Sequence, residues 1–364
     1  MINLIVRGQG IFIFSIFPSS FTLLNDIEDD GLNFYYENST IYVHRIKGSA
    51  ELLKKSIEHR GGEFFFSINA NTSTVHFGFG EARNENILSS YTFDSTNKLL
   101  NSITKLSSNQ KVKIIKDPIK GNVPLLIKKT DDLTMEDIAT DKYMPTSYLS
   151  PVCLQLYNCI SGKKFVLNTP DFPDFSKAID YSINTPGLWC NKTLIEKSNE
   201  FGKSNIDETY LRITLGNNNG ESPGIPYVME IWPSGHYSPV HSHSSANAII
   251  RVLRGEIDVN LYPYLGSDKE FAVQTFKKGD ITWIFSNLNQ IHQLKNDKKN
   301  KKCCITIQCY MYDNNDKTHY EYFDYIDSSG SVQQYKPDSD MDFILFKNII
   351  KAEWNSRKRF TWLS

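Results

Sequence analysis

Eight short strand-like runs follow one another between residues 210 and 312, and they constrain the fold more than any other feature of the chain. Each run is rich in β-branched and aromatic residues, and a segment containing Gly, Asp, Asn or Pro separates it from the next. Because strands at this turn spacing pair with their neighbours in antiparallel fashion, the pattern predicts a closed antiparallel barrel. The predicted strands are 210–215, 227–232, 246–253, 257–262, 271–276, 282–285, 290–295 and 304–312.

The chain has 364 residues, which is longer than a typical single domain, so we expect more than one domain. Residues 1–118 carry aromatic and β-branched runs between Gly, Asn and Asp clusters, which predict a β-rich accessory domain of unknown role. Within it, the segment 49–57 has the pattern of a helix. A Pro- and Gly-containing linker follows, short helices precede the barrel in a domain over 125–330, and 331–364 form a C-terminal tail that ends in a helix.

The composition indicates a folded protein with reduced thiols, which we expect in the cytoplasm. The apolar share of 40% and the aromatic share of 13% suffice for hydrophobic cores. Forty basic and 41 acidic residues nearly cancel, so the charge gives no sign of a nucleic-acid or membrane surface. Six cysteines form no CxxC pair. The apolar run over 11–17 is too short to cross a bilayer and predicts a buried strand.

Three histidines on two strand-like segments predict a metal site. Side chains alternate along a strand, so His241 and His243 project to the same side, and His292 on a neighbouring strand can complete the ligand set. A His-x-His pair alone is equally consistent with two surface histidines. The third histidine, which follows a Gly279-Asp280 turn and an apolar strand, favours the metal site.

The ligand set contains no carboxylate, and this limits the chemistry. Three neutral imidazoles leave a divalent metal with its full charge, which favours an anionic ligand and lowers the pKa of a bound thiol or water. A zinc ion in such a site can generate a hydroxide nucleophile. An Fe(II) ion can bind a thiolate and O2 in adjacent open positions. The histidines by themselves leave both metals open.

Further residues stand at defined spacings around the histidines. They are the segment Trp232-Pro-Ser-Gly-His236, Gly255, Asn296 four residues after His292, the pair Tyr210-x-Arg212, and Tyr310. An arginine offers a planar, permanently charged fork that pairs with a carboxylate through two hydrogen bonds. Taken together over residues 188–324, these features resemble the cysteine dioxygenase family, the cupin thiol dioxygenases.

The resemblance implies a cupin, a mainly β double-stranded β-helix, with Fe(II) held by the three histidines. It implies that Arg212, together with Tyr210, binds the carboxylate of a small thiol, and that Tyr310 acts beside the metal as a second catalytic residue with Arg212. The implied reaction is the oxidation of L-cysteine by O2 to cysteine sulfinate. The expected partners are therefore this small-molecule thiol and O2, with no nucleic acid and no membrane.

The chain departs from the family at several positions. Asn247 and Ala248 stand where common cupins have a ligand Glu, and Ala248 replaces the Cys that animal enzymes link to their active-site Tyr. A Ser-His-Tyr relay is replaced by Thr306, Gln308 and Tyr310, and Gln cannot change its charge. Two other functions therefore compete with the first: a dioxygenase for another thiol such as 3-mercaptopropionate, and a non-catalytic cupin that serves as a metal- or ligand-binding module.

Overall fold

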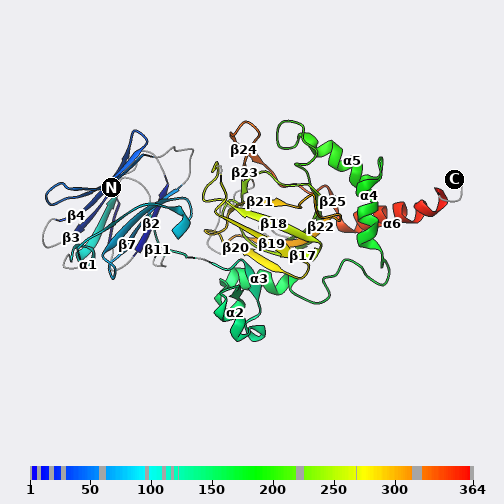
Figure 1. Ribbon diagram of the computed structural model, residues 1–364, viewed down its shortest axis with the longest axis horizontal. Coiled ribbons are helices and arrows are strands. Elements are labelled where there is room, and N and C mark those ends of the chain that lie inside the picture. Colours follow the sequence, from blue (N-terminus) through cyan, green and yellow to red (C-terminus); the bar gives the residue numbers. More distant parts are fainter. Residues whose placement is uncertain are drawn as a thin grey trace. The chain divides into compact units, whose positions relative to one another are not determined.

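The chain divides into two compact units, Met1–Val123 and Pro124–Ser364 (Figure 1). The computed structural model describes residues 2–5, 10–15, 20–25, 30–56, 63–94, 98–108, 112–115, 119–121, 123–218, 225–267, 269–313 and 322–360.

The first unit consists of two antiparallel sheets packed face to face. One sheet has the strand order β1-β10-β3-β4-β5-β6 and the other the order β11-β2-β7-β8-β9. Phe34 of the first sheet lies 5.6 Å from Phe77 and 6.1 Å from Phe66 of the second, measured between ring centroids, and all three are fully buried. The elements are β1 (Ile2–Ile5), β2 (Gly10–Ser15), β3 (Ser20–Asn25), β4 (Gly31–Glu37), β5 (Thr40–Arg45), β6 (Glu51–Ser56), β7 (Glu63–Asn69), β8 (Thr74–Phe79), β9 (Ile87–Thr92), α1 (Leu99–Ser102), β10 (Ile103–Ser108) and β11 (Val112–Ile115).

The helix predicted over 49–57 is wrong, because this segment forms strand β6. β6 pairs with β5 in antiparallel register, and its Leu53 is buried in the core of the unit. A helix this short is marginal in isolation, so the backbone hydrogen bonds offered by a neighbouring strand decide the local conformation.

The second unit is built on two six-stranded sheets, with the strand orders β20-β17-β22-β15-β14-β25 and β19-β18-β21-β16-β23-β24. The eight predicted strands are all present, and the predicted mainly β fold is confirmed. The strands are β14 (Leu211–Asn218), β15 (Ile225–Trp232), β16 (His241–Ser242), β17 (Asn247–Arg254), β18 (Glu256–Leu261), β19 (Ala272–Lys277), β20 (Ile281–Ile284), β21 (Ile291–Lys295), β22 (Cys304–Met311), β23 (Phe323–Ile326), β24 (Val332–Tyr335) and β25 (Met341–Asp342), besides a small parallel pair of β12 (Leu126–Lys128) and β13 (Tyr143–Pro145).

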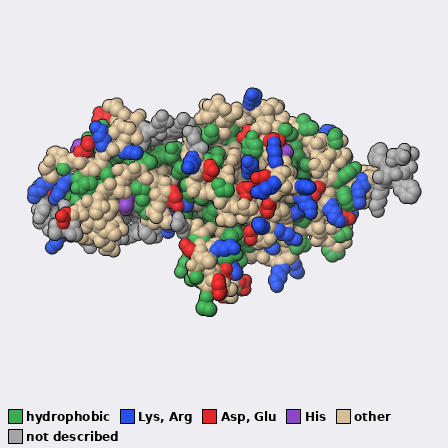
Figure 2. All heavy atoms as spheres, in the orientation of Figure 1, with side chains coloured by type: hydrophobic (Ala, Val, Ile, Leu, Met, Phe, Trp, Pro, Cys, Tyr) green, Lys and Arg blue, Asp and Glu red, His purple; other side chains and the backbone are tan. Residues whose placement is uncertain are grey.

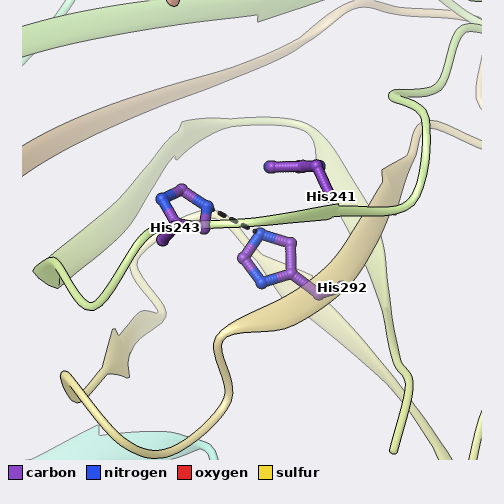
Figure 3. Close-up of side chains that lie close together, drawn as sticks. All are labelled: His241, His243 and His292. Atoms are coloured by element: carbon purple, nitrogen blue, oxygen red, sulfur yellow. Dashed lines mark hydrogen bonds between the residues drawn. The ribbon is translucent and has the colours of Figure 1, made fainter. Parts of the chain in front are cut away.

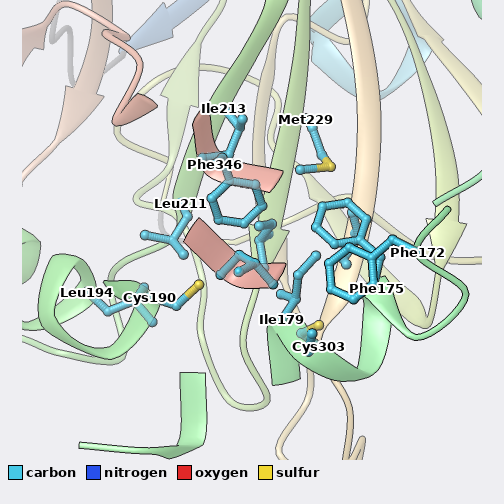
Figure 4. Packing of buried hydrophobic residues seen from close by; sticks show 14 residues of the cluster. Phe172, Phe175, Ile179, Cys190, Leu194, Leu211, Ile213, Met229, Cys303 and Phe346 are labelled. Atoms are coloured by element: carbon cyan, nitrogen blue, oxygen red, sulfur yellow. The ribbon is translucent and has the colours of Figure 1, made fainter. Parts of the chain in front are cut away.

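Helices cover the outer face of the first of these sheets. Leu211 and Ile213 of β14 point outward and pack with helices α4 and α6 (Figure 4). Arg212 between them lines the interior cavity. The same alternation in β15 places Met229 and Ile231 among the apolar residues that pack with these helices, which we call the outer cluster. The helices are α2 (Met135–Ala139), α3 (Pro151–Ile160), α4 (Phe175–Asn184), α5 (Trp189–Glu196) and α6 (Phe343–Phe360).

Residues 331–364, which the sequence pattern separates as a tail, supply β24, β25 and α6 to this unit. Phe346 and Ile350 on one side of α6 are fully buried in the outer cluster, and α6 lies beside α4 (Figure 1). Burial of this apolar stripe holds the helix to the barrel, since amphipathic helices gain most of their stability from packing.

Gly255 and Asn296, which stand at defined spacings from the histidines in the sequence, stabilise turns at strand ends in this unit. Gly255, between β17 and β18, has φ +73°, and a Cβ there would lie 2.9 Å from the carbonyl oxygen of Cys303. The fully buried Asn296 donates from Nδ2 to the carbonyl oxygens of Trp232 at 2.8 Å and Lys302 at 3.1 Å. Both positions therefore have structural roles near the histidine-bearing strands.

Charged side chains of both signs are interspersed over the face of the molecule that Figure 2 shows. This agrees with the formal net charge of −1. Among the described residues, no helix has both the length and the apolar character needed to cross a membrane.

We predict that Phe346→Ala lowers the unfolding free energy of the second unit by about 3–5 kcal/mol, since it removes a fully buried aromatic side chain. Ile344→Ala in the same helix is the control, because Ile344 is 67% exposed, and it should change that free energy by less than about 0.5 kcal/mol. Urea unfolding followed by tryptophan fluorescence reports on this unit alone, since all five tryptophans follow residue 188. Equal effects of the two substitutions would contradict the packing of α6.

Candidate metal centre

Three buried imidazoles converge inside the barrel of the second unit (Figure 3). His241 begins β16 and His243 follows that strand, while His292 lies on β21 directly opposite His241 in the antiparallel register. Each histidine is at most 4% exposed, and one ring nitrogen from each lies within 4.8 Å of the others. The structure therefore brings the three predicted ligands together.

Backbone carbonyls fix the orientation of two of the rings. Nδ1 of His241 donates to the carbonyl oxygen of Pro239 at 3.0 Å, and Nδ1 of His292 donates to that of Asn289 at 3.3 Å. A proton held on Nδ1 leaves Nε2 with its lone pair directed into the cluster, which is the usual arrangement of a metal-binding histidine.

The spacing of the third ring fits a shared cation. Nε2 of His243 lies 3.2 Å from Nε2 of His292. Two nitrogens bound to one ion at about 2.1 Å are separated by about 3.0 to 3.4 Å for right-angled to tetrahedral geometry. Nδ1 of His243 is buried and has no hydrogen-bond partner among the described residues, whereas Nδ1 of each of the other two histidines has a carbonyl acceptor. The three residues fit a divalent metal.

Burial keeps these imidazoles neutral. It lowers the pKa of His241 to about 4 and that of His292 to about 3, and it lowers the pKa of His243 well below its ordinary value, with further lowering by the neighbouring histidines. At neutral pH all three therefore offer lone pairs, and a metal need not displace protons to bind.

Among the described residues, no carboxylate belongs to this ligand group. Asn247, at a position where common cupins have their Glu, is instead engaged away from the histidines. Its Nδ2 donates to Asp313 at 2.8 Å, and its Oδ1 accepts from the backbone N–H of Ser286 at 3.1 Å. The described residues thus leave the three-histidine group neutral.

The histidines open on one cavity that also contains every other predicted site residue: Tyr210, Arg212 and Tyr310. The volume open to the centres of water-sized molecules is about 40 Å³, which is room for an ion and a few small groups. Apolar side chains form most of the wall. They include Ile250, Val252, Leu261, Phe276 and Phe323.

Arg212 is already paired with a carboxylate that the sequence interpretation did not include. Its Nη1 donates to Oε1 of Glu230 at 2.7 Å, and both residues are buried. The two stand directly opposite each other on β14 and β15. Burial raises the pKa of Glu230, while the charge of Arg212 and the hydrogen bond from Gln308 lower it.

The predicted row Thr306, Gln308 and Tyr310 forms a continuous hydrogen-bonded network with this pair. The Tyr310 hydroxyl donates to Oε1 of Gln308, whose Nε2 donates to Oε2 of Glu230 and, at 3.2 Å, to Oγ1 of Thr306. All polar atoms of the Gln308 amide are therefore used, which fixes its orientation. Burial, reinforced by the charge of Glu230, raises the pKa of Tyr310 and keeps the phenol protonated.

Ala248 lies directly opposite Tyr310 in the pairing of β17 with β22, and the two pack together. A sulfur at this position would therefore face the tyrosine, as the resemblance implies for animal enzymes. With Ala248 in that place, no thioether can form.

The remaining residues of the motifs have supporting places. Trp232 lines the cavity and stacks on Tyr210, with ring centroids 4.2 Å apart. His236 lies outside the cavity lining, and its Nδ1 donates to the carbonyl oxygen of Thr209 at 2.9 Å.

Sequence reasoning missed three residues that shape the site. Glu230 could have been noticed as the single charged residue in the apolar run 227–232. Tyr335 lines the cavity from β24, and Asp340 accepts from the backbone N–H of Arg212 at 2.7 Å. Both lie in the polar segment after residue 328, where no periodic pattern signals a role.

No protein-family model matches the chain. Among solved structures it is similar to the cupin domain of Cnp3 from Schizosaccharomyces pombe, with 16% identity over 29% of this chain and 65% of that one and a TM-score of 0.24. It is similar to L-ribose isomerase from an Acinetobacter species in complex with L-ribose, with 12% identity, 28% and 59% coverage and a TM-score of 0.24. It is also similar to the DMSP lyase DddQ from Ruegeria pomeroyi, with 17% identity over 29% of this chain and 49% of that one and a TM-score of 0.23. The chain spans half to two thirds of these structures, which assign it no function.

We predict that His292→Ala weakens Co(II) or Zn(II) binding by about 100-fold or more, because two imidazoles cannot replace a closed set of three. Metal content after dialysis and calorimetric titration measure this. His236→Asn is the control, since it removes an imidazole outside the cluster and retains a donor for the Thr209 carbonyl. Unchanged affinity in His292→Ala would exclude His292 as a ligand.

The metal-free protein is predicted to lose stability as the pH falls from about 6.5, where unfolded histidines titrate, to about 4, the pKa of His241. In this window the unfolded state binds more protons than the folded state, so the unfolding free energy decreases with decreasing pH. Each buried imidazole contributes a slope of about 1.4 kcal/mol per pH unit. Urea unfolding at several pH values should therefore show that the unfolding free energy of His241→Gln depends less steeply on pH. An unchanged pH dependence would contradict the lowered pKa of His241.

Proposed function

We propose that the second unit is an Fe(II)-dependent thiol dioxygenase that oxidises the sulfur of a small thiol with O2. L-Cysteine, with cysteine sulfinate as product, is the substrate implied by the resemblance to the cysteine dioxygenase family. The observation that carries the proposal is the convergence of the three neutral histidines, Arg212 and Tyr310 on one cavity.

The reaction consumes one thiol and one O2 and yields one sulfinic acid. The S–H and O–O bonds break and two S–O bonds form. Sulfur loses four electrons, O2 gains four, and the thiol proton remains on the sulfinic acid. When bound, Fe(II) would supply the one-electron chemistry that lets O2 react with a thiol.

The protein's own residues would provide the surroundings for this reaction. The mostly apolar wall gives the cavity a less polarisable lining than water, which strengthens polar interactions within it. The Tyr310 phenol, protonated and anchored on Gln308, presents an oriented hydroxyl oxygen inside the cavity. The Arg212 guanidinium lies over the Tyr310 ring, 5.7 Å from its centroid, and adds a fixed positive charge.

A second candidate function is a non-catalytic cupin that binds a metal or a ligand. The observation that favours it is the closed network Arg212–Glu230–Gln308–Tyr310, in which the charged anchor already has an internal partner and the central residue cannot titrate. This function entails metal binding without formation of sulfinate from any thiol.

The two functions separate in one assay. The full chain is loaded with Fe(II) without O2 and then mixed with isotopically labelled O2 and L-cysteine, 3-mercaptopropionate, cysteamine or 2-mercaptoethanol. We expect O2 uptake and a sulfinate containing both labelled oxygen atoms from at least one thiol. Metal binding with no such product from any of them would overturn the dioxygenase.

Tyr310→Phe is predicted to lower the rate of sulfinate formation by about tenfold or more while the bound metal is retained, because only the hydroxyl is lost. Tyr148→Phe is the matched control, since Tyr148 is 75% exposed and lies outside the cavity lining. Mass spectrometry of the product under saturating thiol measures the rate. Equal rates for the two variants would remove Tyr310 from the mechanism.

A further inference from the structure

Glu230 places a carboxylate of the protein itself on the guanidinium that would otherwise receive a carboxylate of the substrate. Both of its oxygens accept hydrogen bonds, Oε1 from Arg212 and Oε2 from Gln308. The guanidinium of Arg212 and the amide of Gln308 favour the ionised form of this carboxyl group, against burial, which raises its pKa. The positive charge of Arg212 is thus compensated before any ligand enters.

The pair is costly to separate. Arg212 and Glu230 are 7% and 4% exposed, and they are cross-strand neighbours on two interior strands of a six-stranded sheet. Removing one partner from a buried pair leaves an uncompensated charge, which is a strongly unfavourable change. The backbone of Arg212 is also fixed, because its N–H donates to Asp340 Oδ2 at 2.7 Å and its carbonyl oxygen accepts from the N–H of Asp340 at 2.8 Å.

An incoming carboxylate would therefore have to share Arg212 with Glu230 or displace it. Sharing would bring two carboxylates close together in a buried site. Like charges that are close together repel, so it is unfavourable for both groups to be ionised. A thiol without a carboxylate avoids both costs. Its hydroxyl or amino group can donate to Glu230, since a carboxylate has about four acceptor positions and the described contacts use two.

From this geometry we infer that Glu230 determines specificity, and that the site takes a small thiol without a carboxylate in preference to a thiol carboxylate such as L-cysteine. The inference rests on the proposed function for its reaction, and it replaces the substrate that the family resemblance implies.

Binding to the Co(II)-loaded full chain without O2 tests the inference separately from catalysis. Thiol binding is followed by the sulfur-to-cobalt charge-transfer absorption. Cysteamine and 2-mercaptoethanol are compared with L-cysteine and 3-mercaptopropionate. We expect the thiols without a carboxylate to bind at least about tenfold more tightly than 3-mercaptopropionate, a difference of about 1.4 kcal/mol.

Glu230→Gln keeps the shape of the side chain and removes its charge, so it is expected to shift this ratio by about tenfold or more in favour of the carboxylates. The double variant Arg212→Gln, Glu230→Gln leaves neither charge alone and should bring the ratio near one, which guards against misfolding of the single variant. Glu256→Gln is the control, because Glu256 lies on β18 outside the cavity lining, and it should leave the ratio unchanged.

The outcomes distinguish this inference from the proposed function. Tighter binding of 3-mercaptopropionate or L-cysteine by the unaltered protein, or an unchanged ratio in Glu230→Gln, would overturn the role of Glu230 even if sulfinate forms. The expected ratios together with the absence of sulfinate from every thiol would uphold the selectivity and overturn the dioxygenase.

Discussion

The pairing of β15 between β14 and β22 is the constraint on which the rest of the site depends. It sets Arg212 opposite Glu230 and Glu230 opposite Thr306, and it turns all three side chains to the inside of the barrel. A charge in such a place is tolerated only with a partner, because desolvation penalises it and the low dielectric magnifies its interactions. The hydrogen-bonded network around Glu230 therefore makes a buried arginine possible in this cavity, because it provides the charge of Arg212 with a partner.

The outer and inner faces of the same strands have opposite chemistry. Leu211, Ile213, Met229 and Ile231 pack under helices α4 and α6, while the residues between them line the cavity. The helices thus bury an apolar surface that stabilises the sheet, and the sheet in turn holds the inner side chains in fixed positions. A site on paired strands is more rigid than one on loops, which suits the orientation of small ligands.

The charges inside the barrel balance without a metal. The three imidazoles are neutral, and Arg212 and Glu230 cancel. A divalent ion held by the three histidines would add two positive charges to the cavity that the described residues line, and an anionic ligand would balance them. Because the protein supplies its own carboxylate next to the arginine, the remainder of the ligand need not carry one.

The sequence determined the elements that depend on local pattern. Alternation and turn residues located eight of the twelve described strands in the two six-stranded sheets, and the period of two put His241 and His243 on one side. Tertiary structure decided what depends on pairing between distant segments. The contact of Arg212 with Glu230 follows from strand register, which residue order alone does not give. Tyr335 and Asp340 come from a segment without periodicity, and β6 takes its conformation from its neighbour. Local propensity is a short-range property, whereas register and burial are set by the whole fold.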